Sequence, residues 1–478
     1  MSQLFILDHS LISPGTHHYT HAIGFAEAAK RRGMVPIVAG HLRLDVGRWP
    51  VECQAMPTFC DWVHSGFSVC VTRRPEPPLN PLDPGWYRTL DRSPSFDRSG
   101  SDAYATPTAG SGTSASSWRA GLGEWLRFPM RWGYRRRGLR VTRSMIEALE
   151  TFFAAHPWQD GDQVLMPTVT EFDLVALTEY LVRNPKAQAI PWHFVFHFPL
   201  VIGPWTGDAV QRQRIETMRT HFTTLLGRLR ENCVHLHATS DALIEQYRML
   251  DVGPVDFAPP PVTVWPRCEF DKLGNGSRPL RVLCAGGMRE EKSQELLSGV
   301  IEDLARDDFF GGRIAIWVQS KKIEPLRNVG GGRDWYRADP MGQLPPASAR
   351  LVHVQHPLPV DAFARLMGIA DVAMLAYDRS HYANVSSGVM GECLASGIPT
   401  LVTAGTGPAA EQLAGAGSPD RVAGLTASTS EGFASALRQI AADIDLYRER
   451  AAMIAPGFVA NHSADAVLDK LLASAHNG

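Results

Sequence analysis

The stretch from Asn384 to Thr400 combines residue types suited to binding an anion. Ser386 and Ser387 are favoured helix N-cap residues, Gly388 leaves the backbone accessible, and a Gly-Ile-Pro tripeptide ends the helix-compatible residues that follow. Such a helix start presents backbone N–H groups and the positive end of the helix dipole to an anion. Glu392 lies about one turn beyond Gly388, within reach of hydroxyl groups attached to that anion. The pattern indicates a nucleotide or nucleotide-sugar site.

Apolar runs that alternate with helical patterns surround this stretch and predict two parallel, doubly wound α/β sheets. In the first half, the strand-like runs are 4–7, 35–39, 163–166, 193–198 and 233–238, with helical patterns over 22–32, 174–182 and 212–230. In the second half, the strand-like runs are 280–284, 313–319, 351–355, 372–376 and 400–403, with a helix from 293 onward.

A break in this periodicity at Pro259-Pro260-Pro261 and the polar residues after it predicts a linker. We therefore expect an N-terminal domain over 1–260, a linker over 261–278 and a C-terminal domain over 279–460. The remaining residues, 461–478, are expected to form a helix that packs back on the N-terminal domain.

Two segments depart from the α/β pattern. Residues 73–120 are rich in Pro, Ser, Gly and Asp, which predicts a long loop or disordered insertion. Residues 118–143 interleave five aromatic side chains with eight Arg and one acidic residue. This composition suits peripheral contact with an anionic membrane or a lipid-linked acceptor, or else a solvated helix whose aromatic side chains pack inward.

Composition narrows the class of protein. The chain has 478 residues, 44% of them hydrophobic, with a formal net charge of -2, which does not favour bulk nucleic-acid binding. Its seven Cys form no CxxC pair, so reduced thiols in the cytoplasm are expected rather than disulfides or a zinc module. The first residues predict a strand rather than a signal peptide, and no run of 18 apolar residues occurs.

Several motifs occur in an order that resembles GT-B glycosyltransferases of the retaining group 1, or family 4, type. Residues 371–400 resemble the donor-binding region of that family, which runs from an apolar strand through a Gly-containing turn into Glu-x-x-Ala-x-Gly-x-Pro. Residues 238–244 with 257–262 resemble its strand-Ser-helix unit and interdomain crossing, and residues 285–292 resemble its Gly-Arg-x-x-x-x-Lys loop. The resemblance covers most of the chain except roughly 41–150.

The resemblance implies a GT-B fold, with two Rossmann-like domains facing across a cleft. It also implies transfer of a sugar, with retention, from a nucleotide diphosphate sugar to an acceptor hydroxyl on a glycan or lipid-linked saccharide, as in polysaccharide biosynthesis. No metal or other cofactor is expected, and nucleic acid is not an expected partner.

The same resemblance assigns roles to individual residues. Lys292 would stabilise the departing diphosphate, and His197 would donate a hydrogen bond to the sugar or phosphate. Glu392 matches the second Glu of a Glu-x7-Glu motif and would bind the ribose. Asn384 stands where the family has the first Glu, and Gly287 stands where it has Arg. The expected donor-binding residues are Gly286, Gly287, Arg289, Lys292, Asn384, Ser386, Ser387, Gly388, Val389 and Glu392.

A loop after the first strand carries the remaining site candidates. Gly15, Thr16, His17 and His18 are expected in an acceptor or phosphate loop, because this segment resembles the family's Gly-rich loop. His17 and His18 are candidates for acceptor contact or metal binding, or else ordinary loop histidines.

The sequence leaves two alternative functions open. Asn384 and Gly287 leave open a catalytically inactive homologue that acts as a partner subunit, and a GT-B sugar-nucleotide epimerase is a third reading. A nicotinamide dehydrogenase does not fit, because the first βα turn lacks Gly-x-Gly-x-x-Gly. The Asp-Ile-Asp at 443–445 is expected on a solvated helix face rather than at a metal.

Overall fold

The computed structural model describes most of both domains. The described residues are 1–12, 17–59, 141–267, 278–286, 292, 294–305, 312–321, 335–339, 345–346, 348–418 and 421–475. The expectations for 73–120 and for most of 118–143 therefore lie outside the described residues, as do Gly15, Thr16, Gly287 and Arg289.

The N-terminal half forms a seven-stranded parallel sheet over its described residues, in the order β3-β2-β1-β4-β5-β6-β7. The strands are β1 (Gln3–Leu7), β2 (Val35–His41), β3 (Gln54–Phe59), β4 (Gln163–Val169), β5 (Trp192–Phe196), β6 (Val234–Ala238) and β7 (Val255–Phe257). Around them lie α1 (His17–Arg31), a helical segment over 141–155, α3 (Glu171–Arg183), α4 (Ala209–Leu226) and α5 (Asp241–Arg248), with short turns η1 (Val46–Arg48) and η4 (Pro185–Ala189).

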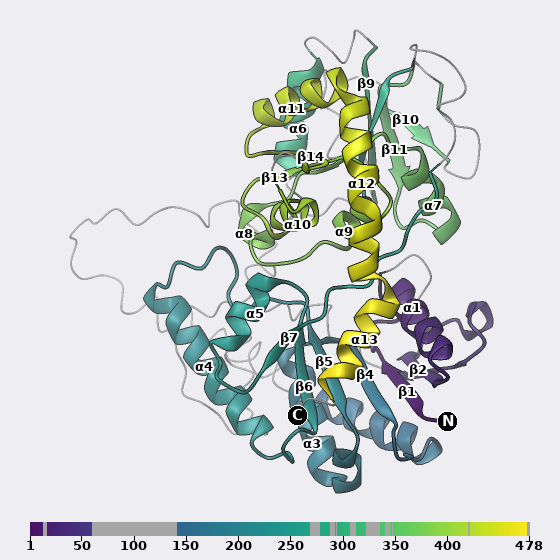
Figure 1. Ribbon diagram of the computed structural model, residues 1–478, viewed down its shortest axis with the longest axis vertical. Helices are drawn as coiled ribbons and strands as arrows, with labels where there is room; N and C mark the ends of the chain where they lie inside the picture. Colours follow the sequence, from purple (N-terminus) through teal and green to yellow (C-terminus); the bar gives the residue numbers. More distant parts are fainter. Residues whose placement is uncertain are drawn as a thin grey trace, which may run out of the picture.

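The C-terminal half repeats this architecture, with the strand order β10-β11-β9-β8-β12-β13-β14. Its strands are β8 (Leu280–Cys284), β9 (Ile314–Ser320), β10 (Tyr336–Ala338), β11 (Leu351–Gln355), β12 (Val372–Leu375), β13 (Thr400–Thr403) and β14 (Gly424–Ala427). Its helices are α6 (Gln294–Ala305), α7 (Val360–Ile369), α8 (Arg379–Tyr382), α9 (Gly388–Ala395), α10 (Gly407–Ala416), α11 (Ser430–Ala442) and α12 (Ile444–His462). Figure 1 shows the two halves stacked along the long axis.

The strand order explains where a ligand would bind. Every pairing between the described strands is parallel, and the order reverses between β1 and β4 in one sheet and between β8 and β12 in the other. Ligands of such sheets bind outside the carboxyl ends of the strands at this reversal. The prediction of two doubly wound α/β sheets is confirmed.

Two element boundaries differ from the prediction and affect candidate residues. Helix α1 begins at His17, so the backbone of His17 and His18 lies in its first turn rather than in a loop. Residues 17–21 carry few apolar side chains, so the helical period is not visible there. Strand β5 ends at Phe196, so His197 follows the strand instead of ending it.

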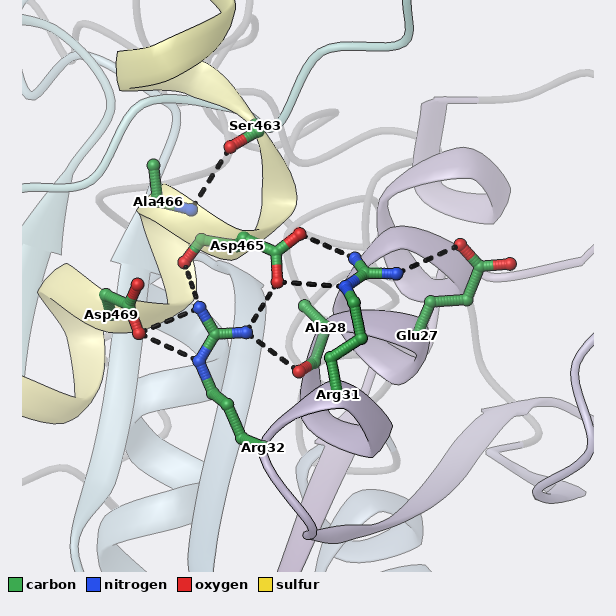
Figure 2. Close-up of polar contacts among 8 residues, drawn as sticks. All are labelled: Glu27, Ala28, Arg31, Arg32, Ser463, Asp465, Ala466 and Asp469. Atoms are coloured by element: carbon green, nitrogen blue, oxygen red, sulfur yellow. Dashed lines mark hydrogen bonds and ion pairs between the residues drawn. The ribbon is translucent and has the colours of Figure 1, made fainter.

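The chain returns to the N-terminal half through α13 (Ala464–Ser474), which packs on α1 (Figure 1). Val467, Leu468 and Leu471 are buried in the same apolar cluster as side chains of α1. Figure 2 shows ion pairs at this contact, where Arg31 and Arg32 bind the carboxylate of Asp465 at 2.6 and 2.7 Å. Arg32 also binds the carboxylate of Asp469 at 2.8 Å and donates to the carbonyl of Ala28 at 2.8 Å.

None of the described helices is long and apolar enough to cross a membrane.

The charge at Asp465 should contribute measurably to the docking of α13. We expect Asp465→Asn to lower the free energy of unfolding by about 0.5 to 1 kcal/mol at low salt, because two partly exposed Arg partners lose their counter-charge. Urea unfolding at low and high salt measures this difference, which should shrink as salt rises. Asp160→Asn, at an exposed position of the N-terminal domain, is the matched control. A salt-independent loss would show that charge pairing is not the cause.

Candidate functional site

Helix α9 begins at Gly388 with Ser387 as its N-cap. The Ser387 hydroxyl accepts a hydrogen bond from the backbone N–H of Met390 at 3.3 Å and lies 2.7 Å from the hydroxyl of Tyr377. Among the described residues, a Cβ added at Gly388 would meet no heavy atom within 4 Å. The first turn of α9 is therefore capped, oriented and open on the Gly388 side, as anion binding requires.

Lys292 lies beside this helix start. Its ammonium donates to the carbonyls of Gly286 at 2.9 Å and Ala285 at 3.2 Å, and it lies 5.5 Å from the ring centroid of Tyr377. Gly286 has a φ of +85°, and an added Cβ would collide with the ammonium and lie 2.9 Å from Val389 Cγ2. The structure thus brings Lys292, Gly286 and Val389 together at the start of α9.

Two carboxyl groups flank the same helix start. Burial raises the pKa of Glu392, on α9, to about 7, and the indole of Trp265 only partly opposes this shift. Burial also raises the pKa of Glu411, on α10, to about 8, against the effect of the Ser386 side chain and the Ser387 backbone. Both groups therefore hold protons far more readily than exposed glutamates do.

The Ser386 hydroxyl donates to the carbonyl of Thr239 at 2.8 Å, so its single proton is directed to the N-terminal domain.

Asn384 and Ser386 direct their hydrogen bonds toward the N-terminal domain. The Asn384 amide donates to the carbonyl of Gly203, and Ser386 donates to Thr239 as described above. Ser386 therefore does not cap α9. Donor contact by these two side chains stays a prediction.

The N-terminal domain contributes histidines paired with carboxylates near the ends of β1 and β4. His18 Nδ1 lies 2.8 Å from Asp8, and His9 Nε2 lies 3.2 Å from Asp173. Burial raises the pKa of the Asp8 carboxyl, but the charge of His18 and its hydrogen bond outweigh burial and hold this pKa below its ordinary value. The side chain of His17 lies outside the described residues.

His197 lies near these histidines but has no ring N–H left to donate the hydrogen bond that was expected of it. Its Nε2 donates to the carbonyl of Pro167 at 2.7 Å, and burial lowers its pKa to about 4. The ring is neutral near pH 7, so Nδ1 carries no proton and can only accept. The predicted donation to a sugar or phosphate is therefore revised to acceptance from a hydroxyl.

Among the described residues, no group of three or more His, Cys, Asp or Glu side chains could hold a metal ion.

Comparisons with known proteins identify the fold. No family model matches the chain, and no curated protein matches it. HepE from Anabaena, solved with UDP and with UDP-glucose, is similar over 100% of both chains in the UDP complex, with a TM-score of 0.56 at 10% identity. Sucrose-phosphate synthase from Thermosynechococcus elongatus is similar over 99% of this chain and 98% of its own, with a TM-score of 0.55 at 13% identity. A glycosyltransferase from Rickettsia africae is similar over 100% and 98%, with a TM-score of 0.54 at 11% identity.

These proteins are GT-B glycosyltransferases. This chain has the GT-B fold. The GT-B architecture that the motif resemblance implied is therefore confirmed, and the retaining, family 4 type stays a prediction.

Within the GT-B frame, the sequence interpretation missed Tyr377 and Glu411. Tyr377 follows β12, and Glu411 lies just over one turn into α10. Helix α9 comes after β12 in the chain, and α10 comes after the neighbouring strand β13. Neighbouring parallel strands end at one edge of a sheet, so polar residues just after β12 and early in α10 are expected to meet. That topological signal was available in the order of the strand-like runs.

The raised pKa of Glu411 predicts a pH effect on stability. The folded protein holds this proton up to about pH 8, whereas the unfolded chain releases it near 4.5, so stability is lost as the pH rises between these values. Glu411→Gln should remove a slope of up to about 1.4 kcal/mol per pH unit.

Urea unfolding at pH 5, 6.5 and 8 measures this slope. Glu449→Gln, at an exposed position on α12, makes the same chemical change as a control. Parallel pH profiles for wild type and Glu411→Gln would contradict a neutral Glu411.

Proposed function

We propose that this protein transfers a sugar from a nucleotide diphosphate sugar to an acceptor hydroxyl with retention of configuration. The observation that carries the proposal is the ammonium of Lys292 beside the open first turn of α9, within a GT-B fold. HepE, of the same fold, has been solved with UDP and UDP-glucose, which supports a nucleotide diphosphate as the ligand class.

In the proposed reaction, the bond between the anomeric carbon and the diphosphate oxygen breaks while the acceptor oxygen bonds to the same carbon. Negative charge grows on the departing diphosphate, and Lys292 and the backbone N–H groups of Gly388 and Val389 would stabilise it. The diphosphate oxygen would take the acceptor proton on the same face of the sugar, which gives retention. His197 would accept a hydrogen bond from a sugar hydroxyl, and Glu392 would bind the ribose.

The proposal predicts a specific response to nucleotides. We expect one of UDP, GDP or ADP to stabilise the protein by about 2.7 kcal/mol at 100 times its dissociation constant. Thermal unfolding with each nucleotide measures this effect. Lys292→Met keeps most of the aliphatic stem near Tyr377 and removes the charge, so it should abolish the stabilisation and the turnover of the matching sugar nucleotide.

Lys186→Ala, at an exposed position on η4, is the control and should behave like wild type. If no nucleotide raises the melting temperature of the wild-type protein, the transferase proposal is wrong. The anomeric configuration of the product, read by NMR, decides between retention and inversion.

We further propose a glycan or lipid-linked saccharide as the acceptor, with peripheral membrane contact through residues 118–143. Liposomes with anionic lipids should carry the protein in flotation experiments, because eight Arg lie among aromatic side chains in this segment. Replacing Arg135, Arg136 and Arg137 by Ser should reduce this binding several-fold. Unchanged flotation of that variant would refute the membrane contact.

A further inference from the structure

The segment 384–386, which leads into α9, is hydrogen bonded to the N-terminal domain. The Asn384 amide donates to the carbonyl of Gly203. The Ser240 hydroxyl donates to the Asn384 carbonyl at 2.9 Å, and the Ser386 hydroxyl donates to the Thr239 carbonyl at 2.8 Å. We call these contacts the interdomain latch, formed by Gly203, Thr239, Ser240, Asn384 and Ser386.

The latch requires a hydrogen-bond donor at position 384. Gly203 presents a carbonyl, which only accepts, so its partner must donate. A glutamate or aspartate carboxylate would place acceptor against acceptor at a position where Asn384 is only 8% exposed. The departure from the family's Glu at this position therefore serves a contact that a carboxylate would break.

Rigid elements hold the N-terminal side of the latch. Ser240 is the N-cap of α5: its oxygen accepts from the N–H of Leu243 at 3.2 Å while its single proton goes to Asn384. The loop before Gly203 is fixed by Gln246 of α5, whose side chain accepts from the N–H of Val201 at 3.1 Å.

The C-terminal side of the latch leads directly into the candidate anion site. Ser386 immediately precedes Ser387, which caps α9 and is oriented by Tyr377. A displacement of residues 384–386 would move this cap and the first N–H groups of α9 with it. The latch therefore joins the position of the anion site to the packing of the two domains.

We propose that Asn384 is a positioning residue. Through the latch, it holds the first turn of α9 in its binding-competent arrangement only while these interdomain hydrogen bonds are formed. The effect on nucleotide binding rests on the proposed function, whereas the effect on α9 does not.

The test uses two variants that break the latch from opposite domains. Asn384→Asp is isosteric but places an acceptor against Gly203. Ser240→Asp still caps α5 but has no proton to give the Asn384 carbonyl. Ser240→Thr keeps both the cap and the hydrogen-bond donor, so this variant should behave like the wild-type protein. Ser348→Asp, at an exposed position of the C-terminal domain, makes the same chemical change as Ser240→Asp and is the matched control.

Hydrogen exchange by mass spectrometry on the ligand-free, full-length protein is the first measurement. Both Asp variants should raise exchange several-fold in 384–395, while exchange in β8 of the same domain stays as in wild type. Nucleotide diphosphate affinity, measured by calorimetry at temperatures where all variants are folded, should fall about ten-fold or more in both.

Unchanged exchange in 384–395 for both variants would overturn the latch. Faster exchange with unchanged nucleotide affinity would overturn its positioning role. If the wild-type protein binds no nucleotide, the proposed function fails, while the exchange data still decide whether the latch exists.

Discussion

Helix α9 begins with backbone N–H groups that no preceding turn of helix can satisfy, and much of the C-terminal domain is arranged around this requirement. Ser387 satisfies one of them, and Tyr377 orients that hydroxyl. Gly388 leaves the next position open, and Gly286 allows the ammonium of Lys292 to approach. Gly286 and Lys292 follow β8, whereas Tyr377, Ser387 and Gly388 follow β12. The pairing of these two strands therefore brings the parts of the site together.

The raised pKa values of Glu392 and Glu411 make these two glutamates compatible with an anion site. Ionised carboxylates beside α9 would repel a diphosphate and offset the charge of Lys292. Burial raises the pKa of Glu392 to about 7 and of Glu411 to about 8, so near neutral pH much of this negative charge is absent. Lys292 and the helix dipole then dominate the local field. A ribose hydroxyl that donates to Glu392 would favour its ionised form, which couples ligand binding to proton release.

The sequence predicted the architecture well because parallel strands are continuous apolar runs that stand out from their surroundings. Strands β8, β11 and β13 have the predicted bounds, and the other strands that were predicted differ by one to three residues at one end or both. The start of α1 was missed because His17 to His21 lack an apolar period. The motif around Gly388 and Lys292 was visible because it depends on local spacing. Glu411, the histidine–carboxylate pairs and the tautomer of His197 depend on contacts between distant segments, which one sequence does not specify.

The return of α13 to α1 affects the order in which the protein can fold. Asp465 lies 434 residues after Arg31, yet Val467, Leu468 and Leu471 complete an apolar cluster that includes Phe25 and Ala29 of α1. During synthesis, this surface of the N-terminal domain stays exposed to solvent until α13 has left the ribosome. The N-terminal domain therefore presents an incomplete apolar surface while the C-terminal domain is being made.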